Sequence, residues 1–174
     1  MQLCEELITE VTQEVCGTLE IPYGDAMINL QAPWERLPYL DAIEKFSGVQ
    51  ITAAMSLADA QAAAGKAGIA AKDIRECQSI WQVAELLFDE KVEANLVQPV
   101  FITDFPRELS PLAKSWPDRP EFTQRFEPYI TGREIGNAFS ELNDPQEQKR
   151  RFEDQVKERE AGNEEGGYMD LDYV

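Results

Sequence analysis

The sequence predicts an α+β fold, because helical and strand-like patterns occupy separate stretches of one chain. Apolar residues recur every three or four positions over residues 3–15 and 80–94, which is typical of helices. Residues 97–105 form an apolar run rich in β-branched and aromatic side chains, which indicates a buried strand. With 174 residues and 43% apolar side chains, the chain is long enough to form a core, either of one domain or of part of one.

The N-terminal part is predicted to contain a helix, a hairpin and a second helix. The first helix covers residues 3–15 and ends at Gly17, since glycine readily adopts the left-handed conformation found after helices. Residues 19–21 and 27–30 are predicted to be strands joined by a four-residue turn at 22–25. A short helix over residues 39–46 then ends at Gly48.

The middle of the chain is predicted to be a small helical insertion. It begins with an alanine-rich stretch, in which residues 57–64 favour helix and Gly65 and Gly68 interrupt it. The periodic pattern of residues 80–94 indicates a further helix. We therefore expect the segment 53–95 to form an insertion between strands, with a packing role.

The C-terminal part combines two strands with a final helix. Residues 126–130 and 133–141 are predicted to be strands that join around Thr131-Gly132. Asp144-Pro-Gln-Glu147 supplies a helix N-cap, a proline at the first helical position and an acid at the third. We expect a helix with Phe152 and Val156 facing inward, followed by a connector over residues 163–168.

Composition excludes several classes of protein. The chain has no histidine, and its three cysteines form no CxxC pair, which argues against a zinc site and against a disulfide framework. A Ser-His-Asp triad is excluded too, and no residue is assigned as a catalytic acid or base. The sequence lacks an apolar run of roughly 18 residues and a signal-peptide pattern. We expect a cytoplasmic protein with no membrane contact.

The formal net charge of −17 disfavours a nucleic-acid interface on this chain. Its basic cluster, Lys149-Arg150-Arg151, is flanked by acidic residues, so the pattern predicts a helix face with internal salt bridges.

Three carboxylates indicate a different kind of site. Glu127, Glu134 and Glu141 lie seven residues apart on segments that read as buried strand. Carboxylates are rarely buried unless they are paired or bind a metal, which suggests a cation site. A hairpin with a solvated acidic face is the alternative.

The stretch that carries these carboxylates resembles the active-site strand of bacterial-type class II lysyl-tRNA synthetases. The resemblance begins at Arg125-Phe-Glu127 and continues through Gly132-Arg133 into Glu134-Ile-Gly-Asn-Ala-Phe-Ser-Glu-Leu-Asn-Asp144. It runs along the whole chain and is weak between about residues 51 and 80. The further matches are Leu3-Cys-Glu-Glu-Leu-Ile8, Gln98-Pro-Val-Phe-Ile-Thr-Asp-Phe-Pro106, Ser110-Pro-Leu-Ala-Lys114 and Arg151-Phe-Glu-Asp-Gln-Val-Lys-Glu-Arg-Glu-Ala-Gly162.

The resemblance implies a part of an antiparallel-sheet catalytic domain, between the second and third motifs that define the class. Residues 1–174 would then be a partial catalytic domain without the anticodon-binding domain. In the complete chain, such an enzyme converts lysine and ATP to lysyl-adenylate and transfers the lysyl group to tRNA(Lys), usually as a homodimer. We expect the isolated segment to be inactive, because the arginine-bearing motifs on either side are missing from it. Most tRNA contacts would lie elsewhere.

The resemblance also implies roles for five residues. Glu127 and Glu134 would bind Mg²⁺ and, through it, ATP, since magnesium prefers oxygen ligands and is often held by one or two carboxylates with substrate phosphates. Asn137, Phe139 and Glu141 would bind lysine, with Glu141 pairing to the ε-ammonium. Three such carboxylates without cations should repel one another and have raised pKa values.

Strand geometry raises a difficulty for this assignment. Successive side chains of a strand alternate between faces, so Glu134 would face away from Asn137, Phe139 and Glu141. All four share one face only if a bulge intervenes, and glycine inside a strand often marks one. We therefore predict an irregularity between Ile135 and Asn137, at Gly136.

Two other functions remain open from the sequence. A synthetase paralogue that attaches lysine or a relative of it to a protein would also lack the anticodon domain. A non-catalytic remnant that acts as a binding module would explain the missing motifs. The intact run from Asn137 to Glu141 favours the synthetase, because it keeps the expected amino-acid pocket.

Overall fold

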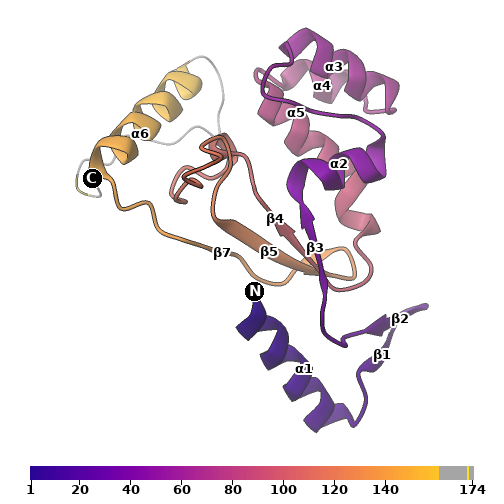
Figure 1. Ribbon diagram of the computed structural model, residues 1–174. Coiled ribbons are helices and arrows are strands. Elements are labelled where there is room, and N and C mark those ends of the chain that lie inside the picture. Colours follow the sequence, from indigo (N-terminus) through magenta and orange to yellow (C-terminus); the bar gives the residue numbers. More distant parts are fainter. Residues whose placement is uncertain (161–171, 173–174) are drawn as a thin grey trace.

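The computed structural model describes residues 1–160 and residue 172, and the predicted connector at 163–168 lies outside them. A five-stranded sheet carries helices on both faces, and a separate two-stranded hairpin lies beside the first helix (Figure 1). In the described part of the chain, none of the helices combines the length and the apolar character that a membrane span requires.

The N-terminal elements match the prediction except at the turn. Helix α1 (Gln2–Cys16) ends at Gly17, which has a left-handed φ of 71°. Strands β1 (Glu20–Tyr23) and β2 (Ala26–Asn29) then pair up to Tyr23 and Ala26. The turn is therefore Gly24-Asp25 and not the four residues predicted, since Pro22 and Tyr23 still belong to the ladder. Gly24 has a φ of 56°, as tight two-residue hairpin turns require.

The main sheet is mixed. Its strands are β3 (Glu35–Pro38), β4 (Val100–Thr103), β5 (Arg125–Ile130), β6 (Arg133–Glu134) and β7 (Ala138–Phe139). The order is β3-β4-β5-β6, and β7 also pairs with β5. The pairing is antiparallel except that β3 runs parallel to β4. The sequence predicted β4 and β5, whereas β3 was missed because only one of its side chains is both apolar and buried.

Helices fill the stretch between β3 and β4. They are α2 (Tyr39–Ser47), α3 (Leu57–Lys66), α4 (Ala71–Glu76), α5 (Ile80–Leu87), the π-helical turn η1 (Phe88–Val92) and the 3₁₀ turn η2 (Glu93–Asn95). The helices predicted at 39–46, 57–64 and 80–94 are confirmed. Gly65 lies inside α3 rather than ending it, and α4 was not predicted.

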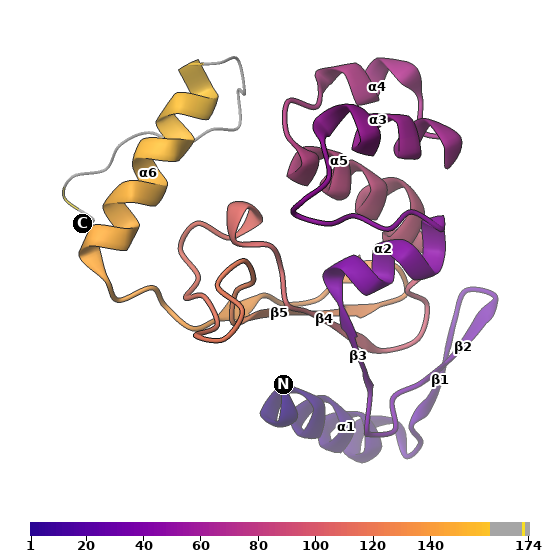
Figure 2. The ribbon, with the colours of Figure 1, turned by 45° about the horizontal axis from the view of Figure 1, so that its top comes forward.

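The two faces of the sheet contact different layers (Figure 2). Val100, Ile102 and Tyr129 join the core formed with the helices from α2 to η1. Phe101 points the other way and packs with Ile28, beneath α1 and the hairpin. This alternation along β4 gives the sheet an apolar core on each side.

The C-terminal helix α6 (Pro145–Glu160) begins as the sequence predicts. The Asp144 carboxylate accepts hydrogen bonds from the backbone N–H groups of Gln146 and Glu147. Phe152 is buried and Val156 half-buried. Arg151 holds the helix against the loop at 110–115, because its guanidinium donates to the Ala113 carbonyl at 2.7 Å and to the Ser115 hydroxyl at 3.0 Å.

We predict that replacing Gly132 by alanine destabilises the fold more than the same change at Gly48. Both glycines have a left-handed φ, of 67° and 72°. A methyl group at Gly132 would meet the Ala94 Cα and the Glu93 carbonyl oxygen at 3.2 Å, whereas nothing lies within 4 Å at Gly48. Gly48→Ala should cost about 1–2 kcal/mol for the backbone conformation, and Gly132→Ala about 1–3 kcal/mol more for overpacking. Urea unfolding measures both values, and equal losses would contradict the predicted clash.

Candidate functional site

The buried carboxylate of Glu127 is the centre of the candidate site. Its strand, β5, directs alternate side chains toward the helical layer, which places Arg125, Glu127 and Tyr129 on one face. Glu127 is only 4% exposed. One of its oxygens accepts a hydrogen bond from the Arg125 guanidinium at 2.5 Å, and the other accepts one from the Tyr129 hydroxyl at 3.0 Å. The charge is therefore paired, as buried carboxylates require.

Arg125 connects this carboxylate to two other segments. Its Nη1 donates to the Leu109 carbonyl and to the Ser110 hydroxyl, both at 2.8 Å. Its Nε donates to Oδ1 of Asn137 at 3.3 Å. The guanidinium also lies over the Phe105 ring, 4.5 Å from the centroid. One side chain thus links β5, the loop after β4 and the segment that precedes β7.

The predicted irregularity at Gly136 is confirmed, and it is a β-bulge. Glu134 pairs with Tyr129 in β5, and Ala138 pairs with Phe126. Between these pairs β5 advances three residues while the facing segment advances four, so one residue is extra. The N–H of Ile135 still bonds the Pro128 carbonyl at 2.9 Å, which places the extra residue among 136–137.

The bulge brings side chains of both short strands onto one face. Directly opposed residues of an antiparallel pair point to the same side of a sheet. Glu134 opposes Tyr129, and Phe139 opposes Arg125, so both lie on the face that carries Glu127. In an unbroken strand Glu134 and Phe139, five residues apart, would have faced opposite sides.

Glu127 and Glu134 line a pocket of about 200 Å³ between the sheet and the helices. Its other walls come from α2, α5, η1 and the loop after β4, and the lining residues are Tyr39, Glu85, Phe88, Asp89, Phe105, Leu109, Arg125 and Tyr129. Partial desolvation and the nearby charge of Glu127 raise the pKa of Glu134, and Arg125 partly opposes this shift. Burial and the charge of Glu127 also raise the pKa of the Tyr129 hydroxyl. The pocket is therefore suited to a cation.

The residues expected to bind lysine lie around this pocket rather than in it. Phe139 lines a neighbouring pocket of about 500 Å³, together with Trp116, Arg36 and Arg119, and Arg125 borders both pockets. Asn137 is exposed and bonded to Arg125. Glu141 is exposed and forms a β-bridge with Ala113, beyond the end of β7. Of the three expected carboxylates, Glu127 and Glu134 therefore line one pocket, and Glu141 is not among the residues that line it.

The carboxylate pair fits a magnesium ion that is shared with a substrate. Among the residues that the structure describes, no group of three or more His, Cys, Asp or Glu side chains is arranged to hold a metal alone. Magnesium is commonly held by one or two carboxylates together with substrate phosphates. Glu134 is exposed, and each Glu127 oxygen keeps a lone pair beyond the bond that it already accepts.

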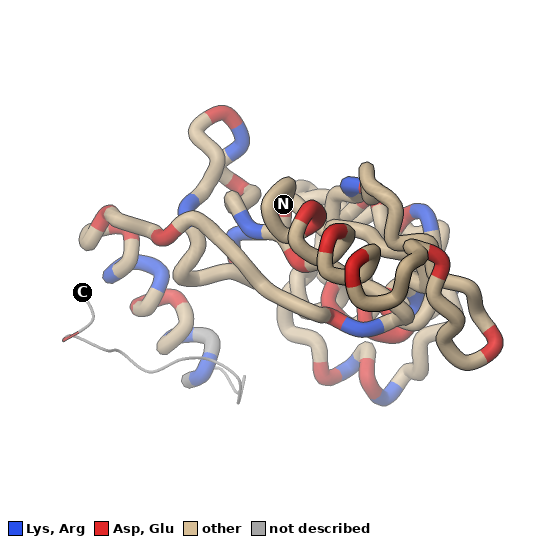
Figure 3. Tube along the Cα trace, turned by 90° about the horizontal axis from the view of Figure 1, so that it is seen from below, with Lys and Arg blue, Asp and Glu red and all other residues tan. Residues whose placement is uncertain are grey.

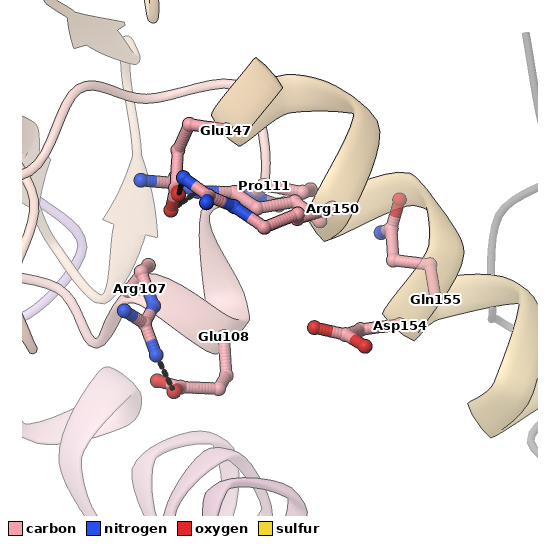
Figure 4. Close-up of a pocket in the computed structure, with 8 residues that line it drawn as sticks. Arg107, Glu108, Pro111, Glu147, Arg150, Asp154 and Gln155 are labelled. Atoms are coloured by element: carbon pink, nitrogen blue, oxygen red, sulfur yellow. Dashed lines mark hydrogen bonds and ion pairs between the residues drawn. The ribbon is translucent and has the colours of Figure 1, made fainter. Parts of the chain in front are cut away.

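A third hollow, of about 250 Å³, separates α6 from the 3₁₀ turn η3 (Arg107–Leu109) (Figure 4). Charged residues line it, but they pair locally. Arg107 bonds Glu108 at 3.1 Å, and Arg150 and Arg151 both bond Glu147, at 2.7 and 3.1 Å. Two of the three residues in the basic cluster of α6 are thus in salt bridges, as the sequence predicts.

Sequence reasoning missed part of the pocket wall. Tyr129 was not among the predicted site residues, yet its hydroxyl bonds Glu127. Its position two residues after Glu127 could have revealed this, because alternate strand residues share a face. Glu85 and Asp89 also line the pocket, and their four-residue spacing places them on one face of a helix.

Comparison with known proteins agrees with these features. The family described as tRNA synthetases class II (D, K and N) matches residues 1–172. Curated relatives include the lysine–tRNA ligases of Carboxydothermus hydrogenoformans, 46% identical, Bacillus cereus strain B4264, 45% identical, and Bacillus subtilis strain 168, 42% identical. Each alignment covers 174 residues, which is the whole of this chain and 34–35% of the relative. The chain thus spans about a third of the length of these relatives.

We predict that the pKa of Glu134 responds in opposite directions to two substitutions. Glu127→Gln removes a neighbouring negative charge and should lower this pKa, whereas Arg125→Met removes a positive charge and should raise it. Carboxyl-carbon NMR titration in the presence of a chelator measures both. Glu153→Gln, on the exposed side of α6, is the control and should leave the value unchanged. If neither substitution changes the pKa of Glu134, its electrostatic coupling to Glu127 and Arg125 is refuted.

Proposed function

The chain belongs to the class II tRNA synthetases (D, K and N), and we propose that it forms the part of a lysine–tRNA ligase that holds lysine and the magnesium-bound phosphates of ATP. The observation that carries this proposal is the register on either side of the bulge after β6, which places Glu134 opposite Tyr129 and Phe139 opposite Arg125, on the face that carries Glu127. It occurs in a chain that matches lysine–tRNA ligases along its whole length.

Glu127 and Glu134 would hold Mg²⁺, which supplies charge neutralisation at the phosphates when it is bound. Arg125 fixes the Glu127 carboxylate on the sheet, and Tyr129 bonds its second oxygen, so one member of the pair is already oriented. Orientation of this kind lowers the cost of forming a charged transition state, because the charges do not have to reorganise. A catalytic acid or base is not required for the activation step that we propose.

Asn137, Phe139 and Glu141 would bind lysine. Asn137 is held near the carboxylate pair by its bond to Arg125, and Phe139 offers an aromatic wall on the same sheet face. Glu141 would pair with the ε-ammonium group, since a desolvated ammonium needs an anionic partner. Its exposed position implies that bound lysine or further chain completes that part of the pocket.

The complete activity would require cations from outside these residues. Arg125 is the one cationic residue among those that line the carboxylate pocket in the described part of the chain, and it is paired with Glu127. We therefore propose that the 174 residues alone do not form lysyl-adenylate. A longer cytoplasmic enzyme, acting as a homodimer on tRNA(Lys), is the proposed setting.

A chimeric enzyme tests the proposal. The matching segment of the Bacillus subtilis lysine–tRNA ligase, 42% identical, is replaced by this chain, and lysine-dependent exchange of pyrophosphate into ATP is measured. We expect exchange in the chimera and none in the isolated chain. Glu127→Gln or Glu134→Gln in the chimera should reduce exchange at least about 100-fold, which is typical when a preorganised charge is removed from such a site.

Controls separate loss of chemistry from loss of folding. Glu121→Gln and Glu153→Gln lie on exposed surfaces outside the pocket and should leave exchange unchanged. A folded chimera that retains exchange after Glu134→Gln would refute the role of the carboxylate pair. A folded chimera that binds lysine but has no exchange would support a binding module instead.

A further inference from the structure

Tyr39 places a phenolic side chain in the wall of the carboxylate pocket. It is the first residue of α2, and its ring packs against Phe88 and Phe105, with centroid distances of 4.6 and 4.9 Å. The residue is only 3% exposed. It lines the pocket together with Glu127. Both ring contacts restrict the side chain, so the direction of its hydroxyl is fixed by the core.

The Tyr39 hydroxyl faces the carboxylates of the pocket. Burial raises its pKa, and the charges of Glu85 and Asp89, from α5 and η1, and of Glu127 add to this shift. All three carboxylates line the same pocket, which places the hydroxyl among them. The raised pKa keeps the hydroxyl protonated at neutral pH, so it is able to donate one hydrogen bond and to accept others.

This hydroxyl has no hydrogen-bond partner among the residues that the structure describes. The Tyr129 hydroxyl, in the same pocket, bonds Glu127 at 3.0 Å. A buried hydroxyl without a partner lowers stability, and phenylalanine would give the same ring contacts without that cost. The Tyr39 hydroxyl therefore points to a ligand that binds in the pocket.

The carboxylates of the pocket are arranged so that they do not all bind one ion directly. In the part of the chain that the structure describes, no three such side chains are placed to hold a metal. Glu127 and Glu134 line the pocket from the sheet, whereas Glu85 and Asp89 line it from the helical layer. Magnesium usually keeps several water ligands, and groups around the metal bind those waters. The helical side of the pocket is therefore suited to water ligands rather than to the ion itself.

We propose that Tyr39, Glu85 and Asp89 form an outer shell around a divalent cation and bind its water ligands. The cation itself would be held by Glu127 and Glu134. The Tyr39 oxygen accepts a hydrogen bond from such a water and donates its own proton to a neighbouring acceptor. Outer groups of this kind change the affinity for a metal by roughly 10–100-fold. The inference rests on the magnesium site of the proposed function and extends that site to the helical layer.

Tyr39→Phe tests the hydroxyl without removing the ring. The 174-residue chain is titrated with Mn²⁺, a probe for the magnesium site, and electron paramagnetic resonance of the free ion gives the dissociation constant. We expect Tyr39→Phe to weaken binding about tenfold, because a water ligand loses its partner. With a chelator present, urea unfolding of this variant should show no loss of stability, since the hydroxyl has no partner to lose. Tyr23→Phe, at an exposed position of β1, is the matched control and should change neither result.

The helical carboxylates are tested as a pair. Glu85→Gln combined with Asp89→Asn should weaken Mn²⁺ binding at least about tenfold. Acidic positions recur throughout the described part of the chain (Figure 3), so the net charge of −17 by itself attracts cations. Glu76→Gln combined with Glu90→Gln is therefore the matched control. It removes the same charge from exposed helical positions outside the pocket and should leave the dissociation constant nearly unchanged.

Glu127→Gln separates failure of the outer shell from failure of the proposed function. If Tyr39→Phe or the double variant leaves the Mn²⁺ affinity unchanged while Glu127→Gln weakens it, the outer shell is refuted and the magnesium site stands. If the chain binds no Mn²⁺, or if Glu127→Gln has no effect, both are refuted. A loss of stability in Tyr39→Phe with a chelator present would also overturn the proposal, because the hydroxyl would then serve folding.

Discussion

The pair of Arg125 and Glu127 is the interaction on which the candidate site depends. It allows a carboxylate to lie buried on β5, where an unpaired charge would be strongly destabilising. The same guanidinium bonds the loop at 109–110 and Asn137, and it covers the Phe105 ring. Three segments that are distant in the sequence are thereby held around one carboxylate.

The bulge and the pair together determine the shape of the site. The extra residue at 136–137 places Glu134 and Phe139 on the face of Glu127. Arg125 then borders two pockets of different character, one lined by carboxylates and the other by aromatic and arginine side chains. Under the proposed function, the anionic pocket would hold magnesium, and the arginines of the neighbouring pocket are already paired with carboxylates. In the proposed enzyme, the remaining cations come from other parts of a longer chain.

Local patterns predicted the parts of the structure that local forces decide. The helices at 3–15, 39–46, 57–64 and 80–94 followed from periodicity or composition. The bulge followed from the shared pocket that the resemblance implies for Glu134 and the lysine-binding residues, together with side-chain parity and the position of Gly136. Strand β3 was missed because its existence depends on pairing with β4, which begins with Glu35 opposite Val100, far along the chain. The separation of Glu141 from Glu127 was also unpredictable, since seven-residue spacing specifies no distance once a strand ends. The roles of the five site residues came from resemblance, and they stay predictions.

A double-mutant cycle tests the central claim most directly. Urea unfolding of the wild-type chain, Arg125→Met, Glu127→Gln and the double variant gives the coupling energy between the two side chains. We expect Arg125→Met alone to cost about 3–5 kcal/mol, because it leaves a buried charge unpaired, and much less when Glu127 is already Gln. The predicted coupling is at least about 1 kcal/mol. Additive effects, within about 0.5 kcal/mol, would mean that the two side chains do not stabilise each other and would contradict the account.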